Sequence, residues 1–228
     1  HNPTIAKIIG YAKTNFDDEE DSLTMIMPFY EKSSLDSIIT KLIKKKAPKE
    51  ITKTSLQIIL IGIARGMKYL HDHSIIHRDL KPRNVLLDEK YHPLIADFGL
   101  SKFYNNLNPV QSINLGTCTY RSPEVIIKSQ NYGEGSDVYS FAILMLEVVS
   151  CKKLPPFSDN DVIEGYRPPI PEDLKPSLKD LIEQCWSKMP EDRPSFTEIY
   201  RKLISDEYFL DDVDANEIRK YIKEINPV

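Results

Sequence analysis

The sequence predicts an α+β fold in which helices dominate and a few short strands lie before residue 100. Apolar residues recur at helical spacing over residues 56–70, which indicates an amphipathic helix that faces a core. In residues 138–149, ten of the twelve side chains are apolar, so the helix that they form must be buried on all sides. Two short apolar runs, 85–87 and 94–96, flank the polar turn 88–90 and predict a β-hairpin. We therefore expect a mainly helical domain with a small β part.

Length and composition exclude several classes of protein. The chain has 228 residues, enough for one large domain or two small ones, and its 41% hydrophobic and 28% charged residues are ordinary for a globular protein. Its net charge of −4 argues against a general nucleic-acid binder. No apolar run approaches the roughly 20 residues that cross a bilayer, so no membrane-spanning segment is expected. The three cysteines, Cys118, Cys151 and Cys185, lie far apart, which favours free thiols in a reducing compartment such as the cytoplasm.

The N-terminal part should begin with two short strands, around residues 5–11 and 23–27, on either side of an acidic turn. A helix is expected over residues 35–46, and it ends in Lys44, Lys45 and Lys46. Positive charges suit a helix C-terminus, so a solvated helix end is favoured over a patch that binds an anionic partner. Because the chain opens at His1 in the middle of an apolar pattern, we expect further residues upstream in the native protein.

The C-terminal half should consist of helices separated by proline-rich breaks. The buried helix 138–149 is expected to begin with Ser136 or Asp137 as its N-cap. Proline pairs between residues 155 and 171 interrupt regular structure. Further helices are then expected near residues 176–188, 195–205 and 215–225.

Side chains with metal-binding chemistry cluster around the predicted hairpin. The segment before its first strand reads His77-Arg78-Asp79-Leu80-Lys81-Pro82-Arg83-Asn84, and the segment after its second strand reads Asp97-Phe98-Gly99. The outer ends of an antiparallel strand pair are neighbours, so Asn84 and Asp97 should converge. A carboxylate and an amide oxygen suit a hard cation such as Mg²⁺. Asp79 lies on the same loop as Asn84, close enough to face whatever the metal holds.

Three more motifs follow in order along the chain. They are Gly116-Thr117-Cys118-Thr119-Tyr120-Arg121-Ser122-Pro123-Glu124, Ser136-Asp137-Val138-Tyr139-Ser140-Phe141, and Cys185-Trp186 with Arg193-Pro194. With the two motifs around the hairpin, the sequence resembles the eukaryotic protein kinases over residues 1 to about 205. The resemblance implies a protein-kinase-like fold, with a mainly α-helical large lobe, the last strands of a small β lobe that is largely missing, and a hinge at about 27–31. Residues 206–228 would form a C-terminal helical extension.

The resemblance also implies roles in catalysis and nucleotide binding. Asp79 matches the catalytic aspartate that orients the substrate hydroxyl, and Lys81 matches the lysine that steadies the transferring phosphate in serine/threonine kinases. Asn84 and Asp97 match the two metal-binding residues, so ATP and Mg²⁺ are the expected cofactors. Adenine would lie between the hinge and the floor of the pocket, formed by Met27, Phe29, Tyr30 and Leu86.

Other matches imply structural or regulatory roles, which fall on His77, Arg78, Phe98, Glu124, Asp137 and Arg193. Glu124 would pair with Arg193, and Asp137 would hold the catalytic loop. Arg78 implies a phosphate on the activation loop, for which Ser112 is the first candidate and Thr119 the second. Thr117 would shape the substrate pocket. A zinc site at His71, His73 and His77 is disfavoured, because the kinase loop accounts for His77 and the end of the preceding helix for His71.

The motifs together imply a serine/threonine kinase of the tyrosine-kinase-like branch, which phosphorylates protein substrates in signalling. Lys81 is typical of serine/threonine kinases, whereas Cys185-Trp186 and residues 166–171 fit tyrosine-kinase-like tails. Two departures are serious: nothing matches the glycine-rich loop, the strand-3 lysine or the helix-C glutamate, and residues 157–165 stand where relatives carry a full helix that helps to dock substrates. A catalytically impaired, pseudokinase-like binding scaffold is therefore the alternative.

Overall fold

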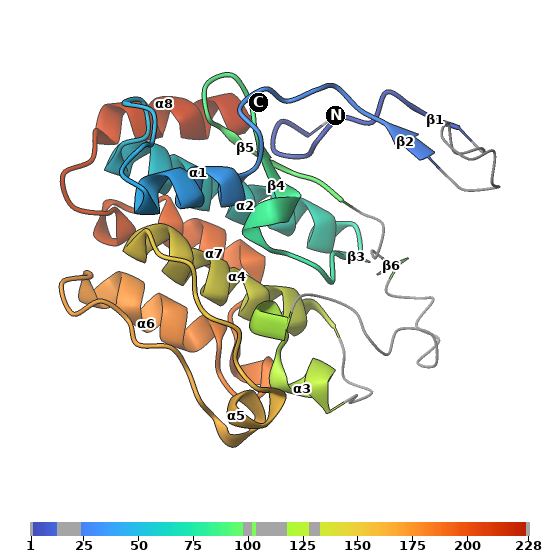
Figure 1. The fold of residues 1–228 in the computed structure, drawn as a ribbon, viewed down its shortest axis with the longest axis vertical. Coiled ribbons are helices and arrows are strands. Elements are labelled where there is room, and N and C mark those ends of the chain that lie inside the picture. The colour runs from blue at the N-terminus through green and yellow to red at the C-terminus, as the bar shows by residue number, and fades with distance from the viewer. Residues whose placement is uncertain (1, 13–23, 98–101, 104–117, 128–132, 227–228) are drawn as a thin grey trace.

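The computed structural model describes residues 2–12, 24–97, 102–103, 118–127 and 133–226 (Figure 1). Phe98, Ser112 and Thr117 lie outside the described residues. The α-helices are α1 (Leu35–Ile43), α2 (Lys53–Asp72), α3 (Pro123–Ile126), α4 (Glu134–Ser150), α5 (Asp159–Glu164), α6 (Pro176–Cys185), α7 (Phe196–Leu203) and α8 (Ala215–Ile225). The strands are β1 (Gly10–Ala12), β2 (Thr24–Ile26), β3 (Ile75–Ile76), β4 (Val85–Leu87), β5 (Pro93–Ile95) and β6 (Lys102–Phe103). Many helices and few short strands confirm the predicted α+β class.

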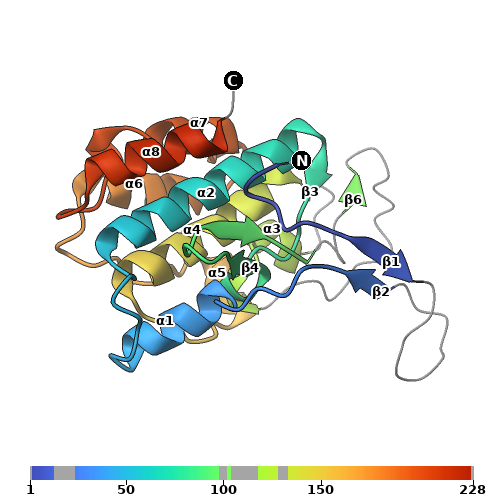
Figure 2. The ribbon, with the colours of Figure 1, turned by 90° about the horizontal axis from the view of Figure 1, so that it is seen from above.

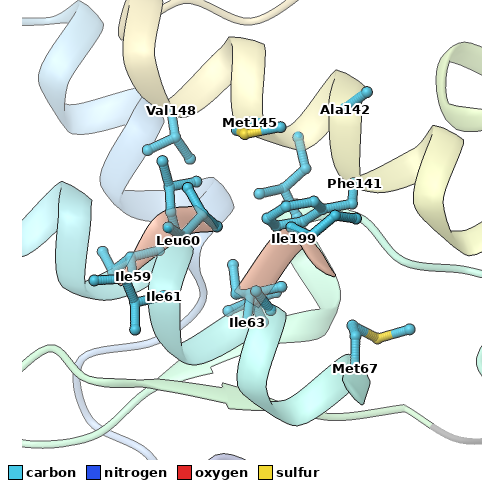
Figure 3. Close-up of a cluster of buried hydrophobic side chains, with 14 of the residues drawn as sticks. Ile59, Leu60, Ile61, Ile63, Met67, Phe141, Ala142, Met145, Val148 and Ile199 are labelled. Atoms are coloured by element: carbon cyan, nitrogen blue, oxygen red, sulfur yellow. The ribbon is translucent and has the colours of Figure 1, made fainter. Parts of the chain in front are cut away.

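The hydrophobic core lies between α2, α4 and α7. Figure 3 shows side chains of all three helices in one cluster. Its labelled members are all fully buried, among them Leu60, Ile63, Met67, Phe141, Met145 and Ile199. Every residue of α4 from position 136 to position 148 is buried, including its polar ones. The prediction of a helix buried on all sides is therefore confirmed. Helix α4 packs against α2 and α6, while α7 and α8 pack on α2.

Side-chain caps explain where several helices begin. Thr52 and Ser55 form a reciprocal capping box at the start of α2, and Ser195 and Glu198 form another at the start of α7. The expected cap of α4 is wrong, because its N-cap is Gly133, and Ser136 and Asp137 lie inside the first turn. The carboxylate of Asp137 bonds to a distant loop instead, as described below.

Among the described residues, three two-stranded antiparallel sheets stand in place of the longer strands expected from the sequence. The predicted hairpin is confirmed as β4 and β5, with Val85 opposite Ile95 and Leu87 opposite Pro93. Strands β1 and β2 pair at Gly10 and Ile26, and β3 pairs with β6. The first two strands are shorter than predicted, because only three residues on each side keep the ladder.

The β1–β2 hairpin leaves large apolar side chains in solvent. Figures 1 and 2 show it projecting from the helical body. The exposed fraction is 63% for Ile9 and 69% for Tyr11, while Ile8 and Ile26 are also exposed. No helix within the described part of the chain is both long and apolar enough to span a membrane.

The C-terminal segment after α7 packs along the outer side of α2. Backbone amides of Leu210 and Asp214 donate to the side chains of Gln57 and Thr54, at 3.0 and 2.8 Å. The predicted helix at residues 215–225 is confirmed as α8, which buries Ile218, Tyr221 and Ile225 against α2 and the β4–β5 turn.

The segment between α4 and α6 contains the short helix α5, which has six residues. It lies within residues 157–165, where the sequence predicts a shorter region than the full helix of related kinases.

Candidate active site

The carboxylate of Asp137, in α4, holds the start of the loop at residues 77–84 by hydrogen bonds. Asp137 is fully buried, and its Oδ2 accepts the backbone amide of His77 while its Oδ1 accepts that of Arg78, both at 2.8 Å. The Nε2 atom of His71, at the end of α2, lies 2.9 Å from Oδ2 of the same carboxylate. These bonds fasten the start of the loop to the most deeply buried helix.

The partners of Asp137 decide its protonation. Burial alone would raise the pKa of this carboxyl, but the hydrogen bonds from His71 and from the His77 amide hold its pKa below the usual value. The group is therefore a carboxylate at neutral pH, and its charge strengthens each bond to the loop.

The ring of His77 joins the loop to the second strand of the hairpin. Its Nδ1 accepts the backbone amide of Asp79 at 3.3 Å, so its Nε2 carries the proton and donates to the carbonyl of Ala96 at 3.0 Å. Between His77 and Asp79, Arg78 has a backbone φ of 71°. This value lies in the left-handed region, which costs free energy for a residue with a side chain. The bonds of Asp137 to the amides of His77 and Arg78 hold the chain in this conformation.

The side chains of Lys81 and Asn84 meet at the carboxylate of Asp79. The Nζ atom of Lys81 lies 2.5 Å from Asp79 Oδ2, and the amide nitrogen of Asn84 donates to the same oxygen at 3.0 Å and to the Asp79 carbonyl at 2.8 Å. Asp79 and Asn84 are buried, at 9% and 5% exposure. Because the side-chain nitrogen of Asn84 donates to Asp79, the carboxamide oxygen of Asn84 points away from Asp79.

The hairpin brings Asp97 to the same end of the structure as Asn84. The amide of Ala96 donates to the carbonyl of Asn84 at 2.9 Å, and Asp97 follows directly with an exposed side chain and a φ of 62°. The carboxamide oxygen of Asn84 and the carboxylate of Asp97 are hard donors, which fits a divalent cation that completes its shell with water or phosphate oxygens. Within the described part of the chain, no group of three His, Cys, Asp or Glu side chains forms a cage for a metal ion.

The expected nucleotide-binding residues lie along the segment that connects β2 to α1 and on β4. Leu86 pairs with Ser34 in an isolated antiparallel bridge, and the amide of Leu87 donates to the carbonyl of Ser33 at 3.0 Å. Leu86 therefore lies beside the connecting segment. Met27 and Tyr30 are half-buried there, whereas the side chain of Phe29 is 90% exposed, so any contact with a base would come from its backbone.

Residues 118–127 are joined to the helical body by two side-chain pairs. Arg193 donates to both carboxylate oxygens of Glu124 at 2.7 and 2.8 Å, and its remaining donors reach backbone carbonyls. The Tyr120 hydroxyl donates to Glu147 at 2.6 Å. Burial raises the pKa of Tyr120, and the charge of Glu147 adds to this, so the phenol keeps its proton. Thr119, at 7% exposure, is buried beside it.

Sequence reasoning missed Glu147 and gave His71 no part in the site. Glu147 is buried at 3% exposure and also accepts the amide of Leu154 at 2.8 Å. Burial raises its pKa, although both hydrogen bonds oppose that effect. The sequence did contain a signal for Glu147, because a carboxylate inside an otherwise apolar helix needs a buried partner.

Comparisons with known proteins agree with this arrangement. The family model described as "Protein kinase domain" matches residues 1–205. The RGS domain-containing serine/threonine-protein kinase A of Dictyostelium discoideum is 40% identical over 152 residues, which are 64% of this chain and 13% of that protein. The serine/threonine/tyrosine-protein kinase HT1 of Arabidopsis thaliana is 35% identical over 169 residues, 71% of this chain and 42% of that protein. The chain thus spans less than half the length of either relative.

Proposed function

The chain belongs to the protein kinase family, and we propose that it transfers the γ-phosphate of ATP to serine and threonine hydroxyls of protein substrates. The observation that carries this proposal is the convergence of Lys81 and Asn84 on the carboxylate of Asp79, next to the hairpin end with Asp97. Both relatives are named as serine/threonine kinases, which supports serine and threonine hydroxyls as the phosphate acceptors. We assign the chain to the tyrosine-kinase-like branch on Cys185-Trp186 and residues 166–171.

Each residue has a role that its chemistry supports. The carboxylate of Asp79 accepts the hydrogen bond of the substrate hydroxyl and orients its oxygen toward the phosphate. Lys81, now paired with Asp79, is near enough to neutralise the charge of the transferring group. Asn84 and Asp97 would hold Mg²⁺, which when bound neutralises charge on the ATP phosphates. Met27, Phe29, Tyr30 and Leu86 would hold the adenine.

Regulation and location belong to the same proposal. Ser112 is retained as the first candidate for activating phosphorylation. Thr119, the second candidate, is buried, so another kinase could not reach its hydroxyl. Thr117 is retained as the residue that shapes the substrate pocket. Within the described residues, the thiols of Cys151 and Cys185 are free, which supports a reducing, cytoplasmic location in a signalling pathway.

A second candidate function is a binding scaffold with impaired catalysis. Two observations favour it: the 228 residues contain no glycine-rich phosphate loop, and the β1–β2 hairpin exposes Ile9 and Tyr11 to solvent. Without a phosphate lid and a lysine–glutamate clamp, these 228 residues alone should bind ATP weakly and transfer phosphate slowly. In that case the chain would act through its surfaces.

Transfer of radiolabelled phosphate from ATP to serine and threonine peptides tests the proposal, with the protein in its native full length. We expect Asp79→Asn to lower kcat by at least about a hundredfold, because the substrate hydroxyl loses its acceptor. Asp180→Asn, on the exposed side of α6, is the matched control and should leave the rate unchanged. Transfer that survives Asp79→Asn would refute the kinase assignment. Absence of transfer together with partner capture that is insensitive to Asp97→Asn would favour the scaffold.

A further inference from the structure

A dense group of lysines follows the last turn of α1. Lys41, Lys44, Lys45, Lys46 and Lys49 lie within nine residues, and no acidic residue stands among them. We call these five residues the lysine tip. With them set aside, 25 basic residues remain against 34 acidic ones, so the rest of the chain is strongly acidic. Positive charge is therefore concentrated in one place on an otherwise negative molecule.

The backbone gathers these charges at one point. After α1 ends, Lys45 adopts a φ of 53° and the chain reverses, so that the amide of Lys46 donates back to the carbonyl of Lys41 at 2.8 Å. All five lysines of the tip are exposed. No carboxylate of the described residues lies within ion-pair distance of any of their ammonium groups. The five charges are therefore exposed to solvent and have no ion-paired carboxylate among the described residues.

A solvated helix end, the interpretation that the sequence alone favours, accounts for part of this arrangement. The helix dipole stabilises cations in the last turn, which covers Lys41 and Lys44. It does not reach Lys49, which lies six residues beyond Ile43, the last residue of α1. Like charges gathered at one place repel one another, and an anionic surface that binds them relieves this repulsion.

We propose that the lysine tip binds the surface of a membrane that contains anionic phospholipids. Lysine ammonium groups act as point charges, which suits a diffuse layer of headgroups, whereas recognition of individual phosphates in a nucleic acid favours arginine and aromatic residues. Residues 41–49 contain neither arginine nor an aromatic residue. In their midst, Ile43 is 48% exposed, an aliphatic side chain able to enter the interface.

The lysine tip lies far from the β1–β2 hairpin. Figures 1 and 2 both place the connection between α1 and α2 at the end of the molecule opposite to β1 and β2. Binding by this end leaves the β1–β2 hairpin free. The proposal is independent of catalysis, because it rests on charge and exposure alone.

Sedimentation with lipid vesicles tests the proposal on the whole chain. We expect binding to vesicles of phosphatidylcholine with about a third phosphatidylserine, and little binding to phosphatidylcholine alone. Each lysine near an anionic surface raises the partition coefficient about fivefold, so replacing Lys44, Lys45 and Lys46 by glutamine should lower it about a hundredfold. Ile43→Ala should cause a smaller, severalfold loss. Raising salt to about 1 M should abolish binding, because screening then acts within about 3 Å.

The matched control removes the same charge elsewhere. Lys188, Lys220 and Lys223 are exposed and lie outside the tip, so their replacement by glutamine should leave vesicle binding unchanged. An equal loss in both triple variants would overturn the proposal, since net charge would then suffice. Equal binding to neutral vesicles would also overturn it and would point to the apolar hairpin. Tighter binding to polyglutamate or to an RNA than to the anionic vesicles would assign the tip to another class of partner.

Discussion

Gly62, in the middle of α2, should be intolerant of even one added methyl group. A Cβ atom there would overlap the hydroxyl oxygen of Tyr221 and lie 2.5 Å from Cγ of Pro93. Overpacking at two rigid contacts costs up to about 3 kcal/mol, and alanine regains about 1 kcal/mol of helix propensity. We therefore expect Gly62→Ala to lower the free energy of unfolding by about 2 kcal/mol.

The hydroxyl of Tyr221 provides the test of this explanation. The group is buried and has no hydrogen-bond partner among the described residues, so Tyr221→Phe should leave stability unchanged or raise it. In the Tyr221→Phe background, one of the two overlaps disappears, and the loss caused by Gly62→Ala should fall to about 1 kcal/mol. The two substitutions should thus show a coupling energy of about 1 kcal/mol.

Urea unfolding, followed by the fluorescence of the single tryptophan, Trp186, measures all four members of this cycle. Gly66→Ala is the matched control, because its added Cβ would meet Ile95 and Thr4 rather than Tyr221. It should destabilise the protein by the same amount with and without Tyr221→Phe. A Gly62→Ala variant as stable as the parent, or one whose loss is unchanged by removal of the hydroxyl, would show that α8 does not pack on α2 as described.

Three further predictions concern the buried charges. Asp137→Asn should lower the free energy of unfolding by about 2–4 kcal/mol and reduce kcat, because the amides of His77 and Arg78 lose a charged acceptor; urea unfolding and peptide phosphorylation measure the two effects. Since the folded pKa of Asp137 is below its usual value of 3.8, this stability is present above about pH 4 and is lost as the pH falls through the folded pKa, so the parent and the variant should converge in acid denaturation. Arg193→Met should cost about 3–5 kcal/mol by leaving Glu124 buried without its cation, and adding Glu124→Leu should recover part of the loss in thermal unfolding.

Those parts of the fold that follow from periodicity could be predicted from the sequence. The helix over residues 56–70 and the buried helix over residues 138–149 lie inside α2 and α4, because apolar spacing reports directly on which faces are covered. The β4–β5 hairpin followed from two apolar runs and a polar turn, and it delivers Asn84 and the residue before Asp97 to one end. In these segments local preference and tertiary contacts agree.

Predictions failed where a side chain has both a local and a distant partner. Asp137 is a good N-cap residue by type, but in the structure its carboxylate serves the amides of a loop 60 and 59 residues away. The predicted helix 35–46 stops at Ile43, because the chain reverses among the lysines. Apolar spacing shows which faces are covered but not which distant partner a polar side chain finds, so the pairing of Glu147 with Tyr120 was missed. The loop-holding role of Asp137 was expected only from the family resemblance.

The geometry of the candidate site therefore depends more on α4 than on the loop that carries the reactive residues. Arg78 has an unfavourable backbone conformation, and the loop around it contains no regular hydrogen-bonded ladder. Asp137 offsets this cost with two charged hydrogen bonds to backbone amides, which any residue type other than proline could donate at those positions. The side chains of Asp79, Lys81 and Asn84 then need only short-range contacts with one another. Substitutions in the buried helix should for this reason alter catalysis without touching the substrate, whereas exposed residues of the loop should tolerate change.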